Sequence, residues 1–126
     1  MTYKDMTISH EKEIFVFRIK DFWSAVTHFI GMVAAIIGMP ILLIKAASYQ
    51  ASFLSMISFM IFMLSMILLY GASASYHSFH VSNRVDMILK KIDHSSIFIL
   101  IAGSYTPICL TALKDTVGQM LLTMIW

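Results

Sequence analysis

Two long stretches without any charged side chain constrain the fold of this chain more than any other feature. Residues 22–44 and residues 49–81 contain no Asp, Glu, Lys or Arg. A predominantly apolar run of about 20 residues is enough to cross the hydrocarbon core of a bilayer. Only 13% of the whole chain is charged, which is about half the share typical of soluble domains. The sequence therefore predicts an integral membrane protein.

The apolar pattern predicts an all-α membrane bundle with three complete transmembrane helices and the start of a fourth. Pro107 lies near the end of the third span, where it should break or kink the helix because proline lacks the backbone N–H. The last apolar segment has only ten residues. A helix that stopped in mid-bilayer would leave backbone carbonyls unpaired, so this segment either belongs to something longer or lies at an interface. The expected spans are residues 22–44, 53–76 and 95–113, and the short segment is 117–126.

The loops differ in length and charge. We expect a short loop at residues 45–52 and a polar connection at 77–93 that holds at most one amphipathic turn. The first 21 residues mix both charge signs and lack a compact apolar core, so they are not expected to be a cleavable signal peptide. They form a separate N-terminal segment, and residues 22–126 form the transmembrane domain.

The distribution of basic residues predicts the orientation. The N-terminal segment carries Lys4, Lys12, Arg18 and Lys20, and the second connection carries Arg84, Lys90 and Lys91. The other two loops carry Lys45 and Lys114. Because Lys and Arg accumulate in cytoplasmic loops, we expect a multi-pass protein of the cell membrane with a cytoplasmic N-terminus. The net charge of +2, without a basic stripe, does not indicate a nucleic-acid partner.

Polar and ionisable residues gather at the predicted cytoplasmic ends of the spans. Ser73 and His77 are four residues apart, which places them on one helical face. Such groups are costly at a membrane edge unless they are paired or hydrated, so they are candidates for a functional site. A neutral imidazole can bind a metal, and a hydroxyl or carboxylate can orient a bound water. Asp93 would act as a general base or as a partner of a metal ligand; His28 and His94 lie at the same depth.

Simpler interpretations exist for each of these residues. A single histidine near a membrane edge is often an interfacial residue that reaches for water, as tyrosine and tryptophan are. Asp93 could instead be the N-cap of the third helix. The residues by themselves leave these alternatives open.

Three segments resemble successive blocks of the hemolysin III family, the bacterial branch of the progestin and adipoQ receptor group. They are "DFWSAVTHFIG", "YGASASYHSF" and "KKIDHSSIFILIAGSYTPI". The resemblance runs from about Asp21 to the end of the chain. It implies a seven-helix membrane protein with the N-terminus inside, of which this chain holds the first half. It also places the chain near proposed zinc-dependent membrane hydrolases.

The resemblance implies a role for several residues. In such proteins zinc is held by a histidine at the end of the second helix and by a His-x-x-x-His pair in the last helix. The first of these matches His77, while the accompanying serine and aspartate match Ser73 and Asp93, the expected catalytic residues. Thr27 and His28 also match, whereas Asp21 and Ser24 stand where the family usually has an acidic residue and an asparagine. No His-x-x-x-His follows in this chain, so the expected zinc site is incomplete, with His80 and His94 as the available substitutes.

The function expected from this resemblance is that of a zinc-dependent hydrolase of lipid amides in the full-length form, with this chain inactive alone. The expected partners are membrane lipids, a lipid substrate and the missing C-terminal helices. Two alternatives remain: lysis of membranes, as the family name says, and a receptor or homeostasis protein without catalysis.

Overall fold

The structure is a computed structural model that describes residues 20–113 and 115–126. Every regular element in these ranges is helical, and three of the helices are long and apolar enough to cross a membrane. The predicted all-α membrane fold, with three spans and a partial fourth, is confirmed. The elements are α1 (Phe22–Ser48), α2 (Phe53–Ser78), α3 (Asn83–Pro107), the π-helical turn η1 (Ile108–Ala112) and α4 (Thr116–Ile125).

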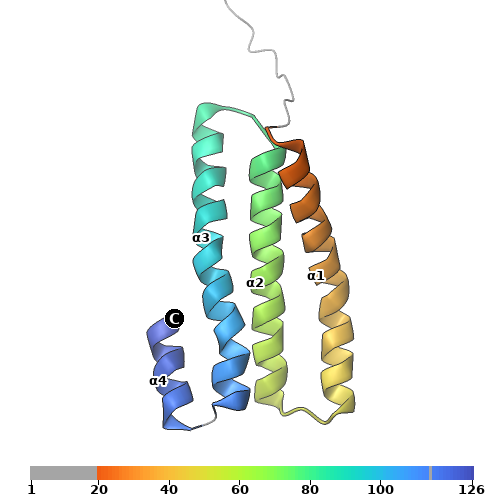
Figure 1. The fold of residues 1–126 in the computed structure, drawn as a ribbon, viewed down its shortest axis with the longest axis vertical. Helices are drawn as coiled ribbons and strands as arrows, with labels where there is room; N and C mark the ends of the chain where they lie inside the picture. Colours follow the sequence, from red (N-terminus) through yellow and green to blue (C-terminus); the bar gives the residue numbers. More distant parts are fainter. Residues whose placement is uncertain (1–19, 114) are drawn as a thin grey trace, which may run out of the picture.

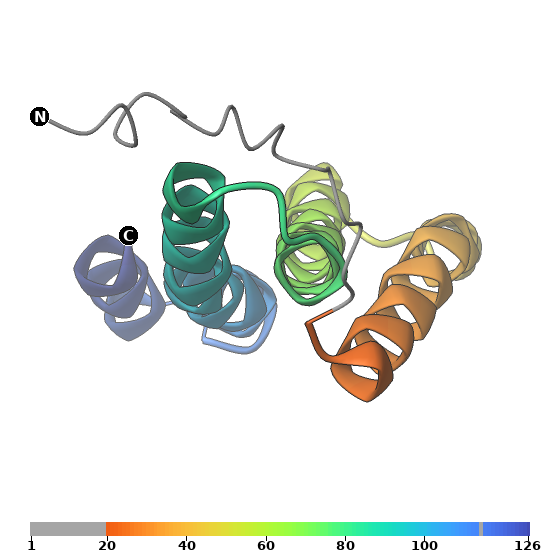
Figure 2. The same cartoon turned by 90° about the horizontal axis from the view of Figure 1, so that it is seen from above.

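The helices stand side by side in a row, with α2 between α1 and α3 (Figures 1 and 2). Within the described residues, α2 packs against both neighbours, whereas α1 and α3 do not contact each other. Large apolar side chains cover the outside of the row; Phe98, for example, is 74% exposed. Such a surface suits contact with acyl chains, because water would make it costly.

Most of the buried residues on the three long helices are small. Lipid tails are as apolar as leucine, so helices in a membrane associate through close packing, which small residues permit. Gly103 of α3 shows this most clearly, because a Cβ there would lie only 2.7 Å from the Cβ of Ser65 on α2. The buried small residues are Ala25 and Ala35 on α1, Ser58, Ser65, Ser73 and Ala74 on α2, and Ser96, Ala102, Gly103 and Thr106 on α3.

A polar side chain caps the start of each long helix. The carboxylate of Asp21 accepts from the backbone N–H and hydroxyl of Ser24. Ser52 accepts from the N–H of Ser55 at 3.2 Å, and Ser82 accepts from the N–H of Val85 at 3.3 Å. These bonds satisfy backbone donors that the first turn of a helix leaves unpaired.

The structure corrects the predicted boundaries of the third span. The start at residue 95 was wrong, because Ser82 caps a helix that already begins at Asn83. Residues 83–93 of the predicted connection are thus helical, and they carry the exposed Arg84, Lys90 and Lys91. The N-cap alternative for Asp93 was also wrong, since Asp93 lies well inside α3.

Other boundaries differ less. Helix α1 continues to Ser48, so the predicted loop at 45–52 shrinks to a tight turn in which Gln50 has a φ of 53°. The predicted break at Pro107 is confirmed, because α3 ends there and η1 follows. The N-terminal segment 1–21 lies outside the described residues except for Lys20 and Asp21, and so does Lys114.

Helix α4 turns back beside α3 (Figure 1). Gly118 makes the turn possible, since a Cβ there would collide with the carbonyl oxygens of Cys109 and Leu113. At the other end of α4, the indole Nε1–H of Trp126 donates to Thr106 Oγ1 at 3.0 Å. These contacts hold the short fourth helix against the last turns of α3.

Replacing Gly103 with alanine should loosen the contact between α2 and α3. The added methyl group would collide with Ser65, and overpacking of this kind typically costs about 1–3 kcal/mol. Gly38→Ala is the matched control, because its Cβ would meet only the flexible end of Met63, at an ordinary 3.5 Å. Thermal unfolding in detergent micelles measures both variants, and equal midpoints would contradict the proposed close approach.

Candidate functional site

The predicted site residues on α1 and α2 lie at one end of the molecule. Helix α1 begins there, α2 ends there and α3 begins there (Figure 1). The backbone N–H of Asp21 donates to the carbonyl oxygen of His77 at 3.3 Å. This bond ties the start of α1 to the last turn of α2 and so brings the polar residues of the two helices together.

Ser73 and His28 form a hydrogen bond between the two helices. Ser73 Oγ lies 2.7 Å from His28 Nδ1. Ser73 is only 5% exposed, and His28 is half-buried. A bond of this kind between transmembrane helices is worth about 0.6–2 kcal/mol, so it contributes to the α1–α2 contact without dominating it.

The ring of His77 lies beside this pair. Its centroid is 5.7 Å from the centroid of the His28 ring and 5.0 Å from that of Tyr76. The Tyr70 ring also lies near His28, with a centroid distance of 6.0 Å. The structure thus places two imidazoles and one hydroxyl together at the α1–α2 interface.

Asp93 lies on α3. Its side chain is 13% exposed, and its Oδ2 lies 3.5 Å from Nδ1 of the neighbouring His94. Among the described residues, no hydrogen bond or ion pair joins Asp93 to Ser73 or His77. The membership of Asp93 in one site with these two residues therefore stays a prediction.

The two substitute ligands, His80 and His94, are engaged elsewhere. The ring of His94 is 62% exposed, and its Nδ1–H donates to the Lys90 carbonyl at 2.9 Å. The ring of His80 lies 2.5 Å from the Asp86 carboxylate. Lys20 also pairs with Asp86, at 3.1 Å, while its ammonium lies 4.4 Å from the centre of the Tyr76 ring. This ion-pair cluster joins Lys20, just before α1, to the first turn of α3.

The residues at hand do not complete a metal site. In residues 20–113 and 115–126, no three His, Cys, Asp or Glu side chains lie close enough together to hold a metal ion. A catalytic zinc site uses three protein ligands and an open position, whereas His28 and His77 are two imidazoles. The sequence counted His28 among the candidate polar residues and matched it to the family within "VTHF", but assigned it no specific role.

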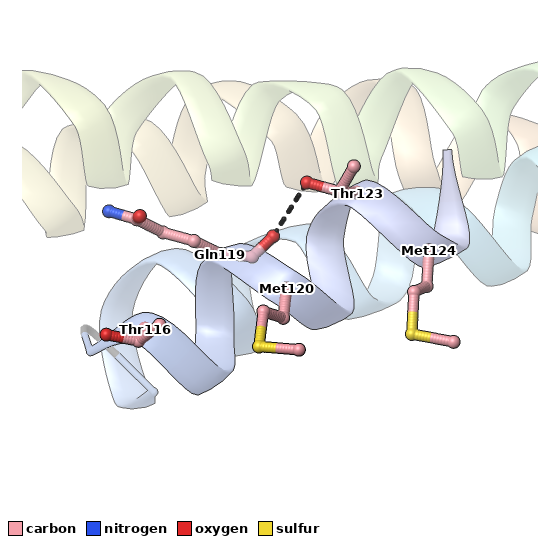
Figure 3. A pocket seen from close by; sticks show the side chains of 5 residues that line it. All are labelled: Thr116, Gln119, Met120, Thr123 and Met124. Atoms are coloured by element: carbon pink, nitrogen blue, oxygen red, sulfur yellow. Dashed lines mark hydrogen bonds between the residues drawn. The ribbon is translucent and has the colours of Figure 1, made fainter.

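A hollow on α4 offers no comparable chemistry. It is lined by Thr116, Gln119, Met120, Thr123 and Met124, which all come from this one helix (Figure 3). The Thr123 hydroxyl donates to the Gln119 carbonyl at 2.9 Å. None of these side chains titrates, so the His28, Ser73 and His77 cluster remains the candidate site.

Three long apolar helices with a polar cluster at one end define a multi-pass membrane protein. A family profile described as "Haemolysin-III related" matches residues 17–126. The chain therefore belongs to the Haemolysin-III related family.

Two relatives extend this comparison. A "Hemolysin-3 homolog" of Bacillus subtilis (strain 168) is 45% identical over 82% of this chain and 47% of its own length. A "Hemolysin-3" of Bacillus cereus is 38% identical over 82% of this chain and 46% of its own length. The chain thus spans about half the length of the curated relatives it matches. No solved structure matches the chain.

The charge of Asp21 should make the fold sensitive to acid. Hydrogen bonds from the side chain and backbone of Ser24 hold the pKa of Asp21 below its ordinary value of 3.8. Because the folded-state pKa is lowered, this contribution to stability is present above pH 3.8 and disappears as the pH falls through the lowered pKa. Asp21→Asn keeps a capping oxygen but cannot titrate, so its unfolding midpoint should lose this part of the pH dependence. Identical acid profiles for the two proteins would contradict the prediction.

Proposed function

We propose that this chain is the first part of a zinc-dependent membrane hydrolase of the hemolysin III type, with His77 as one zinc ligand. The observation that carries the proposal is the placement of a half-buried imidazole beside a buried, hydrogen-bonded hydroxyl at the end of an apolar helix. Ionisable groups inside membrane segments are expensive and are usually retained for function.

The remaining zinc ligands would come from segments that the longer relatives have beyond the shared region. Within the described residues two imidazoles lie together, and no third His, Cys, Asp or Glu joins them, so we propose that the chain is inactive alone. Ser73 and Asp93 are the proposed catalytic residues. Asp93 would supply a general base from α3, where its carboxylate is mostly buried.

The substrate class that we propose is a membrane lipid with a hydrolysable amide bond.

The charge distribution indicates which side of the membrane the site faces. The site lies at the end of the row that carries most of the basic residues of the described ranges: Lys20, Arg84, Lys90 and Lys91, against Lys45 at the other end. Since basic residues favour the cytoplasm, the proposed site faces the cytoplasmic leaflet of the cell membrane, and the N-terminus is cytoplasmic.

Membrane lysis is the alternative, and the names of the two relatives favour it. A receptor or homeostasis role without catalysis would also suit a membrane protein of this family. Release of haemoglobin from red cells by the purified protein, in the absence of lipid hydrolysis, would support lysis over the enzyme.

Metal analysis tests the zinc proposal directly. The chain is joined to the part of the Bacillus subtilis relative that follows the matched segment, and the chimera is purified in detergent. We expect zinc to copurify with the chimera and to be lost in His77→Ala, because a catalytic site needs each of its few protein ligands. The chain without the added segment should bind less zinc than the chimera.

His94→Ala is the matched control, since this histidine is exposed and bonded to its own helix. It should keep the zinc content of the parent chimera. A folded chimera without zinc, or a zinc content that His77→Ala leaves unchanged, would contradict the proposal.

Hydrolysis of a ceramide-type lipid that survives Asp93→Asn would count against the catalytic role of Asp93.

A further inference from the structure

Ser73 differs from the other buried serines of the described helices in where its hydroxyl is bonded. Ser58, Ser65 and Ser96 each donate to a carbonyl three residues earlier in their own helix. This is the usual solution for a serine inside a membrane helix. Ser73 instead bonds to His28 on a neighbouring helix, across 45 residues of sequence. The local bond has been replaced by a longer-range one, which fixes the hydroxyl relative to α1.

The hydrogen-bonding capacity of the two groups decides which one donates. A serine hydroxyl has one proton and two lone pairs, and a neutral imidazole has one N–H and one bare nitrogen. The hydroxyl of Ser73 makes no bond to a backbone carbonyl among the described residues. A buried O–H without an acceptor is costly, and His28 Nδ1 is the acceptor within reach. The hydroxyl therefore donates, and the ring proton of His28 is on Nε2.

We propose that His28 is a positioning residue that commits Ser73 to act as a hydrogen-bond acceptor. Once the single hydroxyl proton is directed to Nδ1, only lone pairs remain on Ser73 Oγ. The hydroxyl can then receive an N–H or O–H group, such as a water or a substrate amide N–H, but cannot donate to an oxyanion. This assigns Ser73 an orienting role in the proposed site and excludes oxyanion stabilisation by this hydroxyl. That role rests on the proposed function, whereas the hydrogen bond does not.

Nitrogen NMR tests the assignment without any substrate or metal. The chain is labelled with ¹⁵N in its histidine rings, reconstituted in lipid nanodiscs at neutral pH, and its His28 resonances are identified from their loss in His28→Gln. We expect a bare, hydrogen-bonded Nδ1 and a protonated Nε2. In Ser73→Ala the Nδ1 resonance should shift, because its donor is gone.

Ser65→Ala is the matched control, since it removes a buried hydroxyl that bonds only within its own helix, and it should leave the His28 resonances in place. A proton found on Nδ1 of the unchanged chain would overturn the proposal. A His28 spectrum that Ser73→Ala does not alter would also overturn it. If Ser73→Ala does not fold, the tautomer of the unchanged chain still decides the question.

The chimera described above separates this inference from the proposed function. His28→Gln keeps an oxygen that can accept from Ser73, whereas His28→Leu does not. Both should retain zinc, because neither alters His77, and lipid hydrolysis should fall more in His28→Leu than in His28→Gln. Equal losses of hydrolysis in the two variants would contradict the positioning role. Absence of zinc from every protein, with the expected His28 tautomer, would contradict the proposed function alone.

Discussion

The close approach of α2 to both neighbours is the constraint on which the rest of the structure depends. In hydrocarbon each backbone polar group needs a partner within its own segment, which confines the spans to helices. The helices then hold together through the shape of their contact surfaces, because burying apolar groups gains little in lipid. Ser65 against Gly103 is one such close contact between α2 and α3. Since α1 and α3 do not touch each other within the described residues, α2 is also the element that relates the polar groups of α1 to those of α3.

Two kinds of polar cluster occupy the end of the row where α1 begins. The outer one is ionic, because Asp86 pairs with Lys20 and His80. This cluster connects Lys20, just before α1, to the first turn of α3. The inner one consists of Ser73, His28 and the ring of His77, and within residues 20–113 and 115–126 no ion pair involves them. Lys20 and Asp86 lie outside the charge-free segments 22–44 and 49–81, whereas Ser73, His28 and His77 lie within them. Polar groups inside a membrane segment are costly unless they are paired.

Much of the fold could be predicted from the sequence, and the reason lies in the length of the apolar runs. The starts of α1 and α2 follow from the caps Asp21 and Ser52 in front of charge-free segments. The start of α3 could not be found in this way, because residues 83–94 contain five charged residues and their hydropathy therefore resembles that of a loop. On the site, the spacing of Ser73 and His77 predicted one helical face. The partnership of His28 with Ser73 could not be derived from spacing, because the two residues are 45 positions apart on different helices. Their contact depends on which face α1 turns toward α2. The relation of Asp93 to the pair depends on how α3 sits against α2, which no local pattern encodes.

The row arrangement also has an energetic consequence. When each helix touches only the next one, the free energy of the assembly is close to a sum over adjacent pairs, as in linear repeat proteins. A disturbance at the α1–α2 contact would then leave the α2–α3 contact nearly intact, so the molecule could lose α1 without losing α3. Such a structure opens stepwise from its edges. Helix α1 is an edge helix and carries His28, so its separation from α2 would break the hydrogen bond between His28 and Ser73.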